Sequence, residues 1–87
     1  EDAHDIVLRI RPWAVERARA WRFHPHQIFE EDGDELVVRF HSGGLLELAN
    51  HLFLWAGDLV IEGPHALEEI MRARLVAAHG FMRPKMS

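Results

Sequence analysis

Residues 27–40 form two extended runs on either side of a turn: Gln27-Ile28-Phe29-Glu30-Glu31-Asp32-Gly33-Asp34-Glu35-Leu36-Val37-Val38-Arg39-Phe40. Both runs, 27–30 and 35–40, are rich in residues that favour strands. Asp32-Gly33 between them is typical of a hairpin, because the central residues of the favoured two-residue turn need positive φ. The sequence therefore predicts two antiparallel neighbouring strands at the centre of the chain.

The segment before this hairpin predicts a strand and then a helix. Residues 5–10 alternate as a strand does, and Pro12 suits the first turn of a helix that runs to about Trp21. His24-Pro25 ends that helix, because a residue before proline avoids helical geometry. The expected apolar positions are Ile6, Leu8 and Ile10 on the strand, and Trp13, Ala14, Ala18 and Trp21 on the helix.

The segment after the hairpin repeats the alternation of helix and strand. Ser42 is the expected N-cap of a second helix, and Gly57 is its expected end. Residues 59–62 predict a fourth strand, Gly63-Pro64 breaks the chain, and a last helix closes at Gly80.

The order β-α-β-β-α-β-α is a split βαβ arrangement with one additional helix. Such an order normally builds a four-stranded antiparallel sheet with both inner helices on one face. We therefore expect an α+β, ferredoxin-like fold with an added C-terminal helix. It should form one domain over residues 1–81, followed by a loose tail over residues 82–87.

Composition narrows the classes of protein that this chain can be. At 87 residues and 48% hydrophobic content it has room for one core, and without cysteine it has no disulfide, thiolate metal site or cysteine nucleophile. The net charge of −4 supplies no basic field for DNA, although protonation of all seven histidines would change it to +3. No apolar run approaches the roughly 18 residues of a membrane span, so we expect a cytoplasmic protein. The start at Glu1 favours a piece of a longer chain.

Residues suited to catalysis are scarce. Ser42 and Ser87 are the serines, threonine is absent, and the carboxylates at 30–35 crowd a hairpin tip where water surrounds them. His24 and His26 form an edge that could touch a metal, but no third ligand has suitable spacing. We therefore expect no enzyme activity, no cofactor and no metal.

Three short motifs, in this order of elements, resemble a known family. They are Ile6-Val7-Leu8-Arg9-Ile10, Trp21-Arg22-Phe23-His24-Pro25-His26-Gln27, and Gly63-Pro64-His65-Ala66-Leu67. Over residues 5–81 the chain resembles the C-terminal extension (WCX) domain of WYL-domain transcriptional regulators. The family commonly reads Trp-His-Pro-Ser-Gln before the hairpin. In this chain Arg22 and Phe23 separate Trp21 from His24, and His26 replaces the serine.

The resemblance implies a bacterial regulator with three parts. A winged-helix or helix-turn-helix domain would bind DNA, a central WYL domain would sense a ligand, and this domain would serve in dimerisation and signal relay. The implied partners are a second copy and the upstream domains, with DNA contacted through the parent protein. Nucleic-acid fragments are among the ligands that the resemblance suggests.

Arg9 and Arg39 are candidate ligand-binding residues. They belong to strands one and three, which are the expected central pair, on the face opposite the helices. Two guanidinium groups there could clamp a phosphate or carboxylate, and single-stranded nucleic acid is a possible partner. The alternative is that they pair with Glu31, Glu62 or a partner chain.

The same face predicts an interface. Val7, Val37 and Phe29, with Val60, would make it more apolar than a solvated sheet surface. The last helix, an upstream domain or a second copy could cover it, and a homodimer is the preferred cover. Tryptophans such as Trp13 supply aromatic area typical of interfaces, unless they belong to the core.

Arg22, His24 and Gln27 are candidates for a polar lip that contacts the sensor domain or its ligand. The alternative is that a histidine or Gln27 hydrogen-bonds the backbone at this junction while Pro25 fixes the path of the chain.

Overall fold

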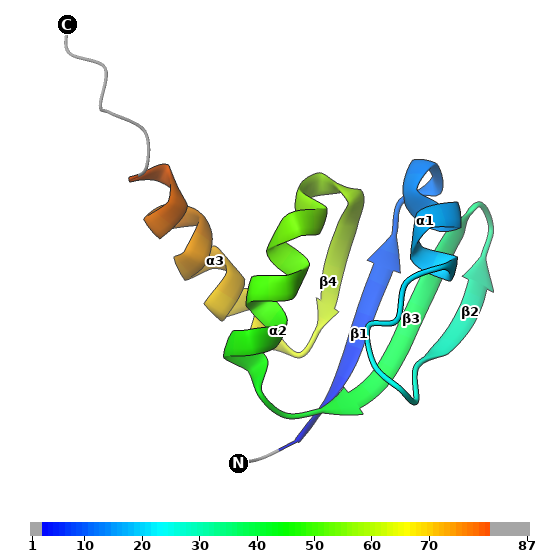
Figure 1. Cartoon of the computed structure of the whole chain (residues 1–87), viewed down its shortest axis with the longest axis horizontal. Helices are drawn as coiled ribbons and strands as arrows, with labels where there is room; N and C mark the ends of the chain where they lie inside the picture. Colours follow the sequence, from blue (N-terminus) through cyan, green and yellow to red (C-terminus); the bar gives the residue numbers. More distant parts are fainter. Residues whose placement is uncertain (1–2, 81–87) are drawn as a thin grey trace, which may run out of the picture.

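The computed structural model describes residues 3–80, an α+β domain with a four-stranded antiparallel sheet and three helices (Figure 1). The tail expected at residues 82–87 lies outside this range. The elements are β1 (His4–Ile10), η1 (Pro12–Ala14, a 3-10 turn), α1 (Val15–Arg19), β2 (Ile28–Asp32), β3 (Glu35–Ser42), α2 (Leu45–Leu52), η2 (Phe53–Asp58, also 3-10), β4 (Leu59–Gly63) and α3 (His65–His79).

The strand order in the sheet is β2-β3-β1-β4, and every neighbouring pair is antiparallel. The prediction that strands one and three form the central pair is confirmed. In their register Ile6 lies opposite Phe40 and Leu8 opposite Val38. β2 and β4 are the two edges of the sheet that the described residues build.

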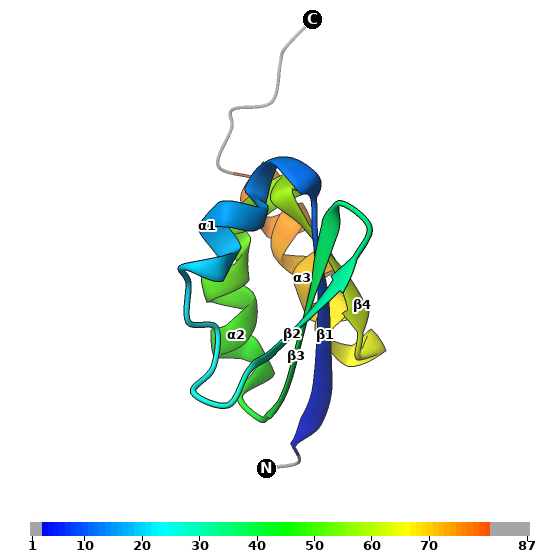
Figure 2. The same ribbon diagram turned by 90° about the vertical axis from the view of Figure 1, so that its right-hand side faces the viewer.

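The core lies between one face of the sheet and the helices α1 and α2, which cover that face together (Figure 2). Ile6, Leu8 and Ile10 are fully buried there, as the alternation of β1 predicts. η1 contributes Ala14 and α1 contributes Ala18 to this core. The opposite face of the sheet is not crossed by any helix among residues 3–80.

The hairpin is present, but its turn is displaced by one residue from the expected position. Asp32 pairs with Glu35, so the two turn residues are Gly33 and Asp34. Gly33 carries a positive φ of 64°, which a glycine adopts without the steric conflict that a Cβ brings. Asp34 does not share the positive φ, so the expectation of two such residues was wrong.

The second helix differs from the prediction at both ends. Ser42 belongs to β3, and the N-cap of α2 is Gly44, in the left-handed region at φ 61°. α2 ends at Leu52 and continues as η2, where Ala56 rather than Gly57 has a positive φ. The sequence signals for start and stop were therefore misplaced by two to five residues, although the helix itself is where it was expected.

The last helix has the predicted extent, and most of its side chains are exposed or half-buried. α3 lies beside α2 and β4, beyond the β4 edge of the sheet (Figure 1). Leu67 is its one buried side chain among those described, and Ile70 and Met71 pack partly against the core. Leu75, which follows Leu67 and Met71 at helical spacing, is exposed.

Candidate functional site

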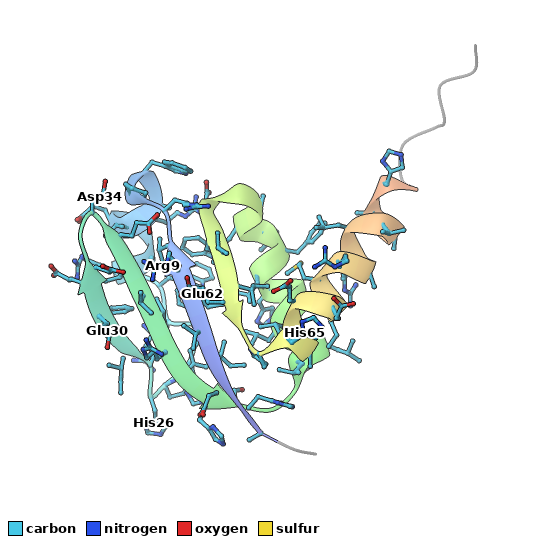
Figure 3. The ribbon with its side chains drawn as sticks, turned by 180° about the vertical axis from the view of Figure 1, so that it is seen from behind. Arg9, His26, Glu30, Asp34, Glu62 and His65 are labelled. Atoms are coloured by element: carbon cyan, nitrogen blue, oxygen red, sulfur yellow. The ribbon has the colours of Figure 1, made fainter. Side chains whose placement is uncertain are left out.

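The open face of the sheet carries a network of charges centred on Arg9 (Figure 3). Arg9 Nε donates to Glu62 Oε2 at 2.7 Å, and Arg9 Nη1 donates to Asp32 Oδ2 at 2.8 Å and to Glu35 Oε1 at 3.2 Å. Glu62, Asp32 and Glu35 belong to β4, β2 and β3. Arg9 on β1 therefore connects all four strands through its guanidinium group.

These contacts explain the electrostatic state of Arg9. The hydrogen bond to Glu62, followed by those to Asp32 and Glu35, raises the pKa of Arg9 above its ordinary value. Arg11 Nη1 donates to Glu35 Oε2 at 3.2 Å and adds a second positive charge at the rim. The positive charges of Arg9 and Arg11 are thus balanced within the cluster, which has three carboxylates for two arginines.

Arg39 lies apart from Arg9 on the same face. Across β1 and β3, Arg39 is opposite Val7, whereas Arg9 is opposite Val37. Arg39 donates to Glu30 Oε1 from Nε at 3.4 Å and from Nη2 at 3.2 Å. Each arginine therefore has its own carboxylate partners, and the expected clamp of two free guanidinium groups is not assembled.

Glu62, one of the alternative partners expected for these arginines, does pair with Arg9. Glu31 does not face them. Its neighbour in β3 is Leu36, on the helix-covered face, and its Oε2 accepts from Arg19 Nη2 of α1 at 3.0 Å.

The apolar side chains expected on the open face are mostly covered or lie elsewhere. Val37 is only 2% exposed, and Val7 is half-buried. Phe29 is opposite Val38 and packs against the core, so its placement on the open face was wrong. The register of β2 puts Ile28, not Phe29, on the open side, and this register could not be read from β2 itself.

The junction between α1 and β2 is held by Gln27. Its Oε1 accepts from the backbone N–H of Phe23 at 2.6 Å and of His24 at 3.2 Å, and its Nε2 donates to the carbonyl of Trp21 at 2.9 Å. Gln27 thus fills the structural role that was the alternative to a polar lip.

The other two residues of the expected lip differ from Gln27. His24 stacks on Phe40, with ring centroids 5.3 Å apart and planes 10° apart, and its Nδ1 accepts from the N–H of His26. Arg22 is exposed and forms no side-chain hydrogen bond or ion pair with residues 3–80. Of the three, Arg22 is exposed whereas His24 and Gln27 are half-buried, so its guanidinium is the polar group most accessible to a partner.

Trp13 lies at the surface, in contact with the beginning of β4. It is 71% exposed, and its Nε1 donates to Asp58 Oδ1 at 2.8 Å. Arg17 Nη2 donates to Asp58 Oδ2 at 2.7 Å, and the guanidinium carbon of Arg17 lies 4.0 Å from the centre of the Trp55 ring. The hydrogen bond from Trp13, then that from Arg17, lowers the pKa of Asp58. Sequence spacing gave no signal for this cluster, because Asp58 is far from Trp13 along the chain.

An apolar groove of about 630 Å³ runs along β4, and we call it the β4 groove. β4, η2 and α3 line it. The lining residues are Leu52, Phe53, Ala56, Gly57, Leu59, Val60, Ile61, Glu68, Met71, Arg72 and Leu75. Glu68 and Arg72 form an ion pair of 2.9 Å at its rim. The apolar spacing of the last helix was the available signal for this groove, but it predicts the helix alone and not the surface that the helix forms with β4.

Between residues 3 and 80, no three His, Cys, Asp or Glu side chains are grouped so that they could hold a metal ion. The helices of this same part of the chain are too short or too polar to cross a bilayer.

Comparison with known proteins identifies the family. No curated protein matches this chain. The WCX domain family, however, matches residues 2–78, which is most of the 87 residues and includes every strand and nearly all of α3. This agrees with the resemblance in residues 5–81, and the chain belongs to the WCX domain family.

Proposed function

We propose that this chain is a non-catalytic assembly and signal-relay domain at the C-terminal end of a WYL-type bacterial transcriptional regulator. The observation that carries this proposal is the match to the WCX family over residues 2–78. The domain would work in the cytoplasm as part of a homodimer. Its partners would be the WYL and helix-turn-helix domains of the same protein, and DNA would be contacted by the parent protein.

We also propose the ferredoxin-like fold class for this domain. The strand order β2-β3-β1-β4, with α1 and α2 on one face, supports that assignment. A fold of this kind offers separate surfaces: an open sheet face, two strand edges and an outer helix layer. A relay domain needs such separation, because it must contact a sensor and a second protomer at the same time.

The surface proposed for contact with the sensor is the helix layer around the segment that joins α1 to β2, residues 20–27, which we call the junction loop. Trp13 is exposed there with its indole N–H fixed by Asp58, and aromatic side chains are enriched at interfaces. Arg22 lies in the loop between α1 and β2, and its guanidinium has no hydrogen-bond or ion-pair partner among residues 3–80. His24 is half-buried beside it. The open face is less suitable, because Val37 is buried and Val7 is half-buried, which leaves little apolar surface for a contact.

The mechanism follows from linkage. A ligand that binds the WYL domain can change the arrangement of two protomers only if it favours one arrangement over another. In this proposal the junction loop contacts the sensor differently in the two arrangements. The domain then passes that difference to the DNA-binding heads.

Direct nucleic-acid binding at the open face is not favoured by its charge. The face carries three arginines and five carboxylates. The arginines are Arg9, Arg39 and, at the rim, Arg11, and the carboxylates are Asp5, Glu30, Asp32, Glu35 and Glu62. A phosphate backbone is attracted by an excess of positive charge, which this face lacks.

The first test of the proposal is to determine which other domains the gene for this chain encodes. The reading frame that encodes this chain should also encode a DNA-binding domain and a WYL domain upstream. A frame without them would overturn the proposal.

The second test uses the full-length regulator and a DNA fragment that it binds. Arg22→Ala should change its affinity for that DNA by about fivefold or more, the low end of typical allosteric coupling, as measured by fluorescence anisotropy. Arg22 has no partner in residues 3–80, so the substitution should leave the melting temperature of the 87-residue chain unchanged. Arg19→Ala removes an exposed arginine whose ion-pair partner within residues 3–80 is Glu31, so it is the matched control and should not change the affinity. Equal affinities for both variants and the wild type would exclude the junction loop as the relay contact.

A further inference from the structure

We propose that the β4 groove is where a second copy of this chain docks, with the β4 strands of the two copies side by side and antiparallel. This inference rests on the proposed assembly role and names the surface that performs it. The sheet has two edges, β2 and β4, and the argument depends on how differently they are protected.

The β2 edge is protected against pairing with another strand. Its last three residues, Glu30, Glu31 and Asp32, are all acidic and exposed. Charged residues on an edge strand discourage edge-to-edge association. Two β2 strands in antiparallel contact would also bring like charges together, which is destabilising.

The β4 edge has no such protection over its first three residues. Leu59, Val60 and Ile61 are apolar, and they pair in regular register with Ile10, Arg9 and Leu8 of β1. The register shift comes after them, toward Gly63. These same three residues line the β4 groove, so the outer edge of the strand opens into an apolar surface.

The apolar surface continues onto α3. Leu75 is 56% exposed and Met71 is half-buried, and both line the groove on the side opposite β4. Val60 is 37% exposed. An apolar strip that lies between an unprotected strand and an apolar helix face fits a strand that adds to the sheet and packs beneath the helix.

A copy of β4 fits this surface better than the other edge strand that this chain can offer. A β2 strand would carry three carboxylates into an apolar groove, where losing their hydration is unfavourable. It would also leave a free β4 on the second copy, and such head-to-tail contacts grow into filaments. Antiparallel β4 against β4 is self-complementary under a two-fold axis, so the assembly closes as a dimer.

The test compares the sedimentation of the wild-type chain with two pairs of variants. The wild type should be a dimer at about 100 µM, above the roughly micromolar dissociation constants at the weak end of specific interfaces. Val60→Lys and Leu75→Lys should weaken the dimer at least about tenfold, because each places a charge in the groove.

The controls put the same charge on apolar residues that lie outside the groove and are somewhat more exposed than Val60 and Leu75. Ile28→Lys lies on the other edge strand, at a residue that is 64% exposed, and Val76→Lys lies on α3 next to Leu75, at a residue that is 72% exposed. Both should dimerise within about twofold of the wild type. Circular dichroism checks that each variant is folded. If Val60→Lys does not fold, the result for Leu75→Lys decides the outcome.

Cross-linking tests the orientation of the two strands. The chain has no cysteine, so Val60→Cys and Ile28→Cys each introduce a single thiol. A short bismaleimide should link Val60→Cys into a dimer and leave Ile28→Cys as a monomer.

Three results would overturn the proposal: a monomeric wild type, a dimer unaffected by both groove variants, or a dimer weakened equally by the controls. Each concerns the surface of the isolated chain. The proposed regulator function fails on a different result, the absence of sensor and DNA-binding domains from the gene.

Discussion

Asp58 is the residue that fastens the beginning of β4 to the segment after β1. Its carbonyl oxygen accepts from the N–H of Arg11 at 2.9 Å, and its carboxylate accepts from Trp13 and Arg17. The carboxylate must be ionised to accept both hydrogen bonds fully, since a protonated carboxyl loses part of its acceptor capacity. Protonation of this one group should therefore loosen the contact between η1, α1 and η2.

The pH dependence of stability should reveal this contact. The pKa of Asp58 is lower in the folded protein than its ordinary value of 3.8. Its carboxylate therefore stabilises the fold above about pH 4, and this contribution is lost as the pH falls through the folded-state pKa. Asp58→Asn should lower the melting temperature at pH 7, and the gap to the wild type should narrow toward about pH 3.

Asp34→Asn is the matched control, because Asp34 lies in the hairpin turn and has no hydrogen-bond or ion-pair partner within residues 3–80. Its gap to the wild type should be small at every pH. A gap for Asp58→Asn that stays constant from neutral to acid pH would contradict the assigned role of the carboxylate.

At the scale of elements, the sequence predicted what depends on neighbouring residues and failed where distant segments decide. The alternation of β1 and the Asp32-Gly33 turn are local signals, and β1 and the hairpin are present. Phe29 failed because only the register with β3 determines which face it occupies. The Asp58 contacts and the β4 groove were missed because each joins segments far apart in the chain.

In α3 the apolar pattern of the sequence does not match the burial of its side chains. Its apolar residues recur at spacings of three and four, as a packed helix requires, but the stripe has little to pack against beyond its first turns. Leu67 is buried, whereas Leu75 and Val76 are exposed. α2 has the shorter pattern but is better packed, with four buried residues: Leu45, Leu48, Ala49 and Leu52.

This difference predicts uneven hydrogen exchange. Amides at 76–79 in α3 should exchange at least about tenfold faster than those at 69–72, because local opening there exposes little buried surface. Amides at 49–52, the last turn of α2, serve as the control for ordinary fraying and should be more protected than 76–79. The measurement is exchange followed by NMR on the Val60→Lys variant, in which the added charge should disfavour the proposed dimer. Equal protection along the whole of α3 would show that its outer half is held by contacts other than those described.

At the scale of the whole molecule, each surface has a different chemical character and therefore suits a different kind of partner. The open face is charged and internally paired, the β2 edge is acidic, and the β4 groove is apolar. The net charge of −4 agrees with this division, since neither the open face, the β2 edge nor the β4 groove gathers an excess of positive charge. Protein contacts therefore fit this molecule better than contacts with a phosphate backbone.

The same charge distribution predicts how the chain treats single-stranded nucleic acid. At pH 7.5 a short oligonucleotide at about 100 µM should not bind the isolated chain, even at low salt where attraction to phosphates is strongest. Fluorescence anisotropy measures this, with Arg9→Ala plus Arg39→Ala as the comparison. If the wild type bound with micromolar, salt-sensitive affinity and the double variant did not, Arg9 and Arg39 would have to leave their carboxylates for phosphates. The strand-bridging role of Arg9 makes that exchange unfavourable, because releasing it would leave Asp32, Glu35 and Glu62 together without the cation that joins them.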